Sequence, residues 1–516
     1  MKLPSMDLVR GTSEKVRGTR ERMRQKQAFV WWIPVFVAFA GVALTEKRLL
    51  DVMGACLALL LLVFMVNRPG GTLIALVIFL PLEVFLFSLL FRFGVPGSFL
   101  RPASAIKELM AVALLIAGLR AIRDRGHKLD RIDIVVLIYV GVVTLYLIVP
   151  HLFAETAVTQ WSPRFLAWRS DAAYPLIFFG ARHAPISPRM KQRMLQVVVV
   201  LGAVMAFIAL YQKLAPTSFS NFVLNTVHVV QYQENVLGQA PSAVASNLAY
   251  ITQIKPLRAS SILLSPFDLG DYLVIIVAAV GVRIGQNARS PLNYVVLAAA
   301  MGAIWFTSVR ADALAAVIIL ALTALPHSRS PVEGRIRLIA ALLVAAAFIV
   351  PSLPGSRFVG AQGGSSSATG HITEIEDGLN VFYYYPLGLG LGAQPGVANR
   401  FDPSKSLNSS DVSDNFITQT ADELGVQALV PWLIMFVFIL IALKRRASTG
   451  DPFAATFGFA LLATMIAGMY HHVFLTFPGP WTLWAGAGLA LSVYKPDTYE
   501  DSAESTITYP ASAGVR

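Results

Sequence analysis

Residues 72–91 read TLIALVIFLPLEVFLFSLLF, a run of 20 residues in which Glu83 is the only charged side chain. A helix of about 20 apolar residues crosses the roughly 30 Å of hydrocarbon in a bilayer. The run lacks the apolar–polar alternation of a membrane β-strand, and a helix satisfies its own backbone hydrogen bonds in lipid. This stretch therefore predicts a membrane-spanning helix.

Similar runs recur along the chain of 516 residues, of which 55% are hydrophobic and only 14% are charged. A soluble domain carries about 25% charged residues. We therefore expect an all-α polytopic membrane protein with about 14 transmembrane helices. The predicted spans are residues 29–45, 49–66, 72–91, 106–121, 132–152, 165–181, 194–213, 267–283, 291–309, 311–326, 336–353, 425–443, 452–470 and 480–494.

The basic residues predict the orientation of these spans. An even number of spans places both termini on one side of the membrane. With both termini in the cytoplasm, about 28 of the 42 Lys and Arg residues lie inside and about 14 outside, as the positive-inside rule requires. Topology and anionic headgroups thus explain the net charge of +12 without a nucleic-acid partner. The single cysteine, Cys56, lies within a span and indicates neither a disulfide framework nor a metal site.

The spans divide the chain into segments of different character. They are a basic cytoplasmic N-terminal segment (1–28), N-terminal transmembrane helices (29–213), an extracytoplasmic loop (214–266), further transmembrane helices (267–353), a large extracytoplasmic loop (354–424), C-terminal transmembrane helices (425–494) and a disordered cytoplasmic tail (495–516). Long loops in compact proteins are usually functional or disordered. The two long outer loops are therefore where we look for function.

The larger loop contains two helical patterns. Apolar residues at helical spacing predict an amphipathic helix over residues 371–382, which the Tyr383-Tyr384-Tyr385-Pro386 stretch ends. The glycines in residues 388–392 allow a tight backbone path afterwards. The second pattern is expected to run through Glu423-Leu424-Gly425 directly into the span at 425–443.

Two arginines lie at the predicted outer ends of spans, Arg258 before the eighth span and Arg310 between the ninth and tenth. Outer basic residues oppose the topology rule, which makes them better functional candidates than inner ones. A guanidinium can grip a phosphate with two hydrogen bonds. The alternative is pairing with lipid headgroups or with neighbouring carboxylates, which are Asp268 or Asp271 for Arg258 and Asp312 for Arg310.

Other polar residues near the outer ends of spans are expected to be structural. These are Arg164, Arg169 and Asp171 at the sixth span. His471 and His472, at the outer end of the thirteenth span, are expected at the membrane interface, with a role in lining the site as the alternative.

Several of these motifs together resemble the bacterial O-antigen ligase and polymerase superfamily, which includes exopolysaccharide polymerases. The stretch from Ser413 to Phe416, followed by Glu423-Leu424-Gly425, is similar to the end of the family's large outer loop. Ser308 to Ala311 resembles the family pattern Ser-Arg-Gly/Ala with one residue inserted, and Arg258 to Asp268 resembles its arginine-containing stretch. Tyr385 to Gly392 looks like its "Pro, aliphatic, Gly, aliphatic, Gly" motif.

The resemblance implies a site for transferring a glycan from a polyprenyl diphosphate to a hydroxyl. Arg258 and Arg310 would hold the diphosphate, and Asn415 would orient a neighbour. Asp414 stands where the family has a histidine, and a carboxylate can take over the role of base. Secondary candidates are His371 and Glu374, as alternative bases, and His472 at the outer end of the thirteenth span.

No metal or other cofactor is expected. The first outer loop, around Glu46-Lys47-Arg48, lacks the paired acids that metal-dependent lipid-linked glycosyltransferases usually carry there. The two arginines would supply the positive charge that a leaving diphosphate requires. The resemblance therefore implies a metal-independent membrane glycosyltransferase, although the replacement of the histidine also fits a different acceptor or an inactive relative.

The resemblance favours polymerisation of surface or exopolysaccharide repeat units at the bacterial inner membrane. The number of spans, the long loops and the missing histidine favour a polymerase over an O-antigen ligase proper. Expected partners are undecaprenyl-diphosphate-linked glycan and membrane lipids, together with a flippase and a chain-length regulator. The alternatives are a flippase or transporter, which would be expected to show matching broken helices in its two halves, and a non-catalytic partner in polysaccharide assembly.

Overall fold

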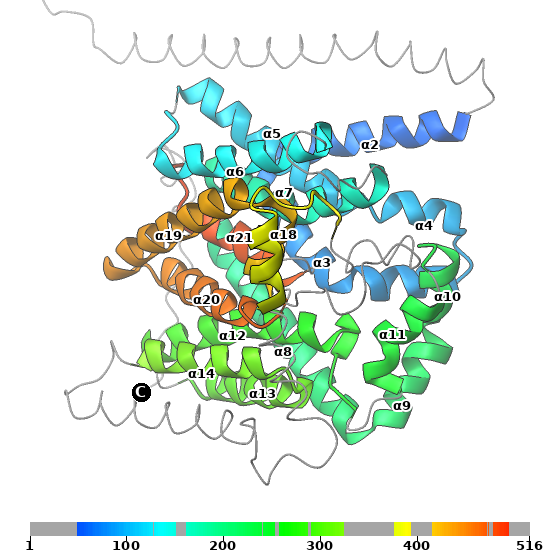
Figure 1. Cartoon of the computed structure of the whole chain (residues 1–516). Coiled ribbons are helices and arrows are strands. Elements are labelled where there is room, and N and C mark those ends of the chain that lie inside the picture. The colour runs from blue at the N-terminus through cyan, green and yellow to red at the C-terminus, as the bar shows by residue number, and fades with distance from the viewer. Residues whose placement is uncertain are drawn as a thin grey trace, which may run out of the picture. The chain divides into compact units, whose positions relative to one another are not determined.

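The structure is a computed structural model of the chain (Figure 1). It describes residues 49–126, 128–150, 161–239, 241–252, 257–286, 290–324, 376–393, 415–471, 473 and 478–494. Across these residues all regular structure is helical, and no β-strand occurs among them. The expected all-α class is therefore confirmed for the described part of the chain.

The chain divides into two compact units, residues 1–65 and 66–516. The described residues of the first unit all belong to α2 (Leu49–Asn67). The helices that follow are α3 (Pro69–Arg92), α4 (Gly97–Ala103), α5 (Ile106–Arg125), α6 (Arg131–Ile148), α7 (Trp161–His183), α8 (Pro188–Leu214), α9 (Pro216–Asn221), the π-helical turn η2 (Phe222–Thr226), α10 (Val229–Asn235), α11 (Pro241–Thr252), the 3₁₀ turn η3 (Ser261–Leu263), α12 (Pro266–Gln286), α13 (Pro291–Thr307), α14 (Arg310–Ala324), α18 (Phe416–Leu424), α19 (Val426–Ser448), α20 (Pro452–Gly468) and α21 (Gly479–Ala490).

Among the described helices, four are long and apolar enough to cross a membrane, and these are α3, α6, α8 and α19. Further apolar helices, including α13 and α20, are shorter. Each predicted span coincides with a helix, apart from 29–45 and 336–353, which lie outside the described residues. The chain is thus a helical protein whose apolar helices suit a multi-pass membrane protein.

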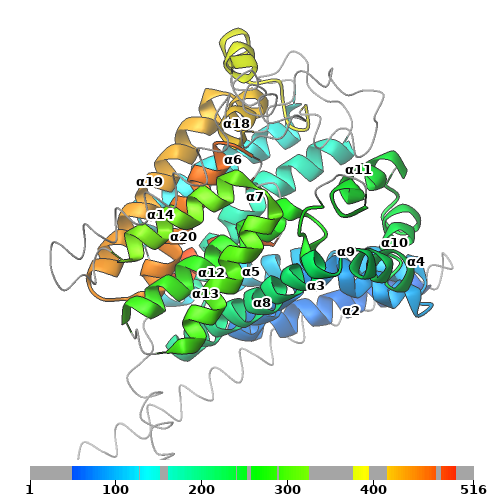
Figure 2. The ribbon, with the colours of Figure 1, turned by 90° about the horizontal axis from the view of Figure 1, so that it is seen from below.

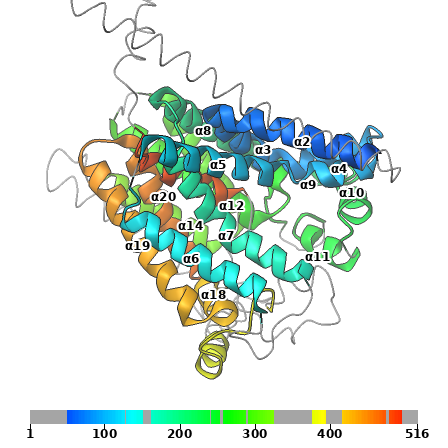
Figure 3. The ribbon, with the colours of Figure 1, turned by 90° about the horizontal axis from the view of Figure 1, so that it is seen from above.

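Helix α12 lies at the centre of the second unit and is buried along most of its length. It packs against α8, α13, α14, α20 and α21 (Figure 1 and Figure 2). On another side of the unit, α7 packs against α5, α6 and α21 (Figure 3). The two groups of helices meet because α21 contacts both α7 and α12.

Glycines allow these helices to approach closely. A Cβ atom on Gly180 of α7 would lie 2.8 Å from the backbone of Leu114 in α5. One on Gly488 of α21 would lie 2.3 Å from the carbonyl oxygen of Phe178 in α7. Small residues at such contacts are typical of membrane helices, where packing replaces the hydrophobic driving force. A larger side chain at either position would push the helices apart.

The predicted loop at 214–266 contains helices that the sequence pattern did not indicate. Within it, α9, η2, α10 and α11 form a small subdomain that packs on α3 and α8, and the shared apolar core includes Phe219, Val229, Leu248 and Leu264. The predicted amphipathic helix at 371–382 is helical over residues 376–384, and residues 371–375 lie outside the described part. It ends before Tyr385, within the stretch of tyrosines expected to end it.

The expectation of one continuous helix from 416 into the span at 425–443 is wrong. Helix α18 ends at Leu424, and α19 begins at Val426 in a different direction (Figure 1). Gly425 separates them with a φ of 67°, a conformation that favours glycine. A Cβ on Gly425 would also lie 2.4 Å from the backbone of Leu387, so only glycine fits this corner.

The glycine-rich stretch before α18 in the sequence binds the end of that helix. The N–H of Leu389 donates to the carbonyl oxygen of Asp422 at 2.7 Å, and that of Gly390 donates to Glu423 at 2.9 Å. The carbonyl of Pro386 accepts from Val426 at 2.9 Å. The last carbonyls of a helix have no partner within it, so this stretch supplies the missing donors and holds the corner between α18 and α19.

A buried charge cluster joins the ends of α6, α7 and α21. Arg182 pairs with Asp133 at 2.7 Å and with Asp130, and it also donates to the carbonyl of Leu491 at 3.3 Å. His183 lies 2.9 Å from the same Asp133 carboxylate. Partial burial acts to raise the pKa of Asp130, but the hydrogen bonds and charge of Arg182 outweigh it and hold that pKa below its ordinary value. The cluster is therefore a structural connection between three helices.

Replacing Arg182 tests this connection. Arg182→Met is expected to lower the free energy of unfolding by about 3–5 kcal/mol, because it leaves the buried Asp133 carboxylate without its cation. Thermal unfolding of the purified protein in detergent measures the effect. The control is Arg123→Met, since Arg123 pairs with Asp124 on the surface, where such pairs are worth about 0–1 kcal/mol. Equal losses in the two variants would contradict the assignment.

Candidate functional site

A side chain of α8 holds the segment that carries Arg258. The Oε1 atom of Gln212 accepts hydrogen bonds from the N–H groups of Ser260 and Ser261, each at 2.9 Å. Its Nε2 atom donates to the carbonyl oxygen of Arg258 at 3.3 Å. Gln212 is only 4% exposed. The side-chain amide of Gln212 therefore provides hydrogen-bond partners for buried backbone groups of this short irregular segment.

The same segment is tied to the end of α13. The N–H of Ala259 donates to the carbonyl oxygen of Phe306 at 2.8 Å. The chain then turns at Ser308, which has a φ of 58°, and α14 begins at Arg310. Non-glycine residues with positive φ are uncommon and cluster at functional sites. Ser261 and Ser308, with φ values of 52° and 58°, place two such residues beside the two candidate arginines.

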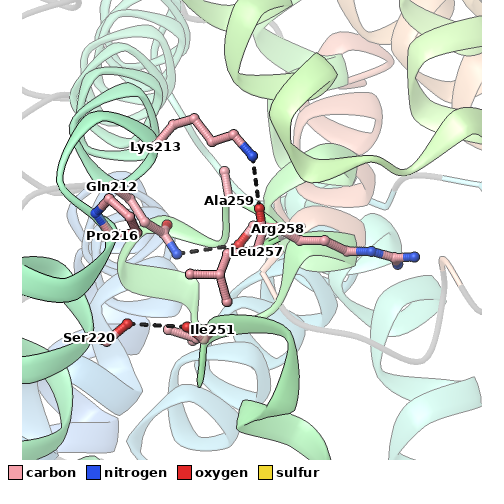
Figure 4. Close-up of a pocket in the computed structure, with 8 residues that line it drawn as sticks. All are labelled: Gln212, Lys213, Pro216, Ser220, Ile251, Leu257, Arg258 and Ala259. Carbon is pink, nitrogen blue, oxygen red and sulfur yellow. Dashed lines mark hydrogen bonds between the residues drawn. The ribbon is translucent and has the colours of Figure 1, made fainter. Parts of the chain in front are cut away.

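Arg258 lines a cavity of about 300 Å³ between the end of α8 and the subdomain of residues 216–252. Ile251 and Leu257 supply apolar walls, and Lys213 brings a second positive charge. Lys213 donates to the carbonyl oxygen of Leu257 at 3.0 Å, and its ammonium lies 5.6 Å from the centre of the Phe306 ring. Figure 4 shows the side chain of Arg258 extending away from Gln212. Two basic residues thus contribute to the lining: Lys213, whose ammonium is bonded to a backbone carbonyl, and Arg258, whose guanidinium extends away from the other residues drawn.

Arg310 begins α14 and is exposed, whereas Asp312 is fully buried. The alternative interpretation of Arg310 paired it with Asp312, but among the described residues Asp312 pairs with His471 instead, and Arg310 forms no ion pair there. Asp271, one of the carboxylates considered for Arg258, lies 3.6 Å from the Nε2 atom of the same His471. Asp312 is therefore paired with His471 rather than with Arg310.

The other residues of the predicted site are placed unevenly. Asn415 is the N-cap of α18, where its side chain accepts a hydrogen bond from the N–H of Ile417 at 2.8 Å. This contact stabilises the start of the helix. The remaining candidates, which lie outside the described residues, are Asp414, His371, Glu374 and His472.

The two arginines of the sixth predicted span contact neighbouring helices and their ends. Arg164 donates to the carbonyl oxygen of Leu147 at 3.1 Å, and Arg169 pairs with Glu108 of α5 at 2.9 Å. Both contacts hold α7 against its neighbours. Neither arginine is among the residues that line the cavity beside Arg258.

A polar cluster inside the bundle was not predicted from the sequence. Asp171 of α7 and Glu423 of α18 are both buried, with 4% and 2% of their surfaces exposed. They lie close enough for the charges of the two carboxylates to repel each other. The hydroxyl groups of Tyr139 and Tyr174 are 3.3 Å apart, and Trp432 donates to Tyr174 at 2.9 Å. Asp171 and Glu423 were noted as single polar residues, but only helix packing brings them together.

A second unpredicted cluster contains Asp271, Asp312 and His471. The Nε2 atom of His471 lies 3.2 Å from an oxygen of Asp312 and 3.6 Å from one of Asp271. All three residues are buried, and one potential ligand atom from each lies within 4.8 Å of the others. His471 was expected at the membrane interface, and its aspartate partners were considered only as partners for arginine. These three residue types can ligate a cation.

No protein-family model matches this chain, and the comparison with curated proteins found no match.

Gln212 provides a test of how the Arg258 segment is held. Gln212→Leu is expected to lower the free energy of unfolding by about 1–3 kcal/mol, because the buried N–H groups of Ser260 and Ser261 lose their acceptor. Thermal unfolding in detergent measures the loss. Gln286→Leu is the matched control, since Gln286 is exposed at the end of α12. A variant at Gln212 as stable as the control would show that the amide does not hold the segment.

Proposed function

We propose that this protein transfers a glycan from an undecaprenyl-diphosphate-linked oligosaccharide to a hydroxyl acceptor on the extracytoplasmic side of the bacterial inner membrane. The product would be a surface polysaccharide or exopolysaccharide, extended by one repeat unit at each transfer. The observation that carries the proposal is the cavity with Arg258 and Lys213 in its lining. The resemblance of the surrounding motifs to O-antigen ligases and polymerases supports the same reaction.

The charges of the cavity suit a polyprenyl diphosphate. Arg258 would bind the diphosphate with paired N–H groups, and Lys213 would add a point charge. The apolar walls formed by Ile251 and Leu257 suit the first part of a lipid chain. Arg310 follows the turn that is bonded to the Arg258 segment through Phe306, which supports a shared role for the two arginines.

The chemical step would require little beyond positioning and charge. The acceptor hydroxyl oxygen forms a bond to the anomeric carbon of the donor sugar, and the bond from that carbon to the diphosphate oxygen breaks. The hydroxyl proton passes to a base, for which Asp414 is the candidate. The diphosphate leaves as an anion, and fixed cations stabilise the charge that develops on it.

Arginine variants test the reaction. In cells lacking this gene, Arg258→Ala and Arg310→Ala are each expected to restore at least about 100-fold less long polymer than the wild type, the loss typical of removing one charge-stabilising donor. Polymer length and lipid-linked repeats on each side of the membrane are measured at matched protein levels. The control is Arg123→Ala, an exposed arginine far along the chain from both motifs.

The outcomes separate the candidate functions. Single repeats that accumulate outside support a polymerase, and complete polymer that fails to reach its acceptor indicates a ligase. Repeats that stay inside indicate a flippase. Full activity of both arginine variants would refute the proposed roles, and full activity of Asp414→Ala would place the base at another residue.

The topology can be tested separately. In a Cys56→Ala background, Ser366→Cys in the predicted outer loop should react with a membrane-impermeant maleimide in intact spheroplasts. Ser448→Cys, at the end of α19, should react only after lysis. Mass spectrometry of the labelled protein gives the result. The reverse pattern would invert the orientation and exclude extracytoplasmic transfer by the loop residues.

A further inference from the structure

We propose that Asp271, Asp312 and His471 bind a divalent transition-metal cation of the Zn²⁺ type. Asp271 comes from α12, Asp312 from the first turn of α14, and His471 from the chain just after α20. The site would therefore connect α12, α14 and the segment that follows α20. The inference is independent of the proposed glycan transfer, because it rests on these three side chains alone.

The first argument is charge. Asp271 is 3% exposed and Asp312 is 0% exposed, so two carboxyl groups are removed from water at one place. Both oxygens of Asp271 and Oδ2 of Asp312 lack a hydrogen-bond partner. Within the described part of the chain, no lysine or arginine forms an ion pair with either residue. Buried carboxylates without compensation are costly, and a divalent cation would neutralise both.

The cluster at Asp133 shows what the chain does when it compensates such a group itself. His183 lies 2.9 Å from Asp133, much as His471 lies beside Asp312. At Asp133, however, Arg182 approaches to 2.7 Å and supplies the positive charge. The two clusters have the same Asp–His pairing but differ in this cation. A metal ion bound at Asp312 would supply the positive charge that Arg182 supplies at Asp133.

The second argument is geometry. Zn²⁺ binds histidine nitrogen and carboxylate oxygen at about 2.0–2.2 Å in a tetrahedral arrangement, which places neighbouring ligand atoms about 3.3–3.6 Å apart. The distances from Nε2 of His471 are 3.2 Å to Asp312 and 3.6 Å to Asp271. Both values are close to the tetrahedral spacing, and the three ligand atoms all lie within 4.8 Å of one another. A small shift of side chains would accommodate the ion, with a water molecule as a fourth ligand.

Two glycines and an aromatic ring surround the side chains of the cluster. A Cβ atom on Gly270 would lie 1.8 Å from Oδ2 of Asp312, so any other residue there would displace this carboxylate. A Cβ atom on Gly479, at the start of α21, would lie 3.3 Å from the Cβ atom of Asp271. Phe267 packs beside the imidazole of His471, with ring centres 5.6 Å apart. The ligands are thus confined on several sides.

The preference for a transition metal follows from the ligand types. Imidazole suits Zn²⁺ and similar ions, whereas Mg²⁺ and Ca²⁺ prefer oxygen ligands throughout. Two carboxylates with one histidine therefore favour Zn²⁺ or Co²⁺ over Mg²⁺. The buried position of the cluster also favours slow release of the bound ion.

The test uses the full-length protein purified in detergent, treated with a chelator and desalted. Zn²⁺ is added, the free ion is removed, and the bound metal is measured by mass spectrometry; Co²⁺ gives an absorption spectrum that reports tetrahedral ligands. We expect one ion per chain. Asp312→Asn and His471→Gln should each weaken binding by about 100-fold or more, since loss of an outer-shell contact alone costs about 10–100-fold.

Two further variants keep the test decisive. Gly270→Ala retains all three ligands but displaces Asp312, so it should weaken binding as well. His183→Gln changes the matched Asp–His pair and should leave binding unchanged, even if it lowers stability. Absence of tightly bound Zn²⁺ in the wild type would overturn the proposal, as would equal binding by wild type and His471→Gln. This experiment measures metal binding and not polymer formation, so its result does not depend on whether the protein transfers glycan.

Discussion

Burial of ionisable groups is the constraint on which this helical bundle depends. A charged side chain away from water needs an opposite charge or hydrogen bonds. Glu83 of α3 pairs with Lys107 of α5, and Arg169 of α7 pairs with Glu108 in the same α5. Each of these pairs holds two helices in one relative position. Charge compensation therefore stabilises particular helix pairs, while apolar packing supplies most of the contact area.

Helix ends impose a related requirement, because their last carbonyl groups lack partners within the helix. Arg446 donates to the carbonyls of Ala490 and Ser492, so a residue of α19 binds the end of α21. Gln212 of α8 likewise bonds to backbone groups of another segment: it accepts hydrogen bonds from the N–H groups of Ser260 and Ser261 at the start of η3. Long polar side chains from one helix thus complete the backbone hydrogen bonding of another. The irregular segments beside the cavity are held in this way.

The sequence predicted much of the fold but few of the polar contacts between helices. Arg258 and Arg310 became candidates because they lie at the ends of apolar runs, a local property. Lys213 was missed as part of the cavity because it continues α8 and carries no motif. His471 was placed at the interface because the pattern could not show that α12 and α14 present two aspartates to it. The break at Gly425 was missed since the helical pattern of its flanks is uninterrupted.

The sequence by itself determined the helical class and the position of most helices. Each apolar run has the length and composition that only a helix satisfies in lipid. The tertiary structure decided which polar groups meet. His471 and Asp312 are separated by 159 residues, and Gln212 and Ser260 by 48. Such contacts depend on how helices pack, which is set by the shapes of whole helix faces and is not encoded in any local pattern.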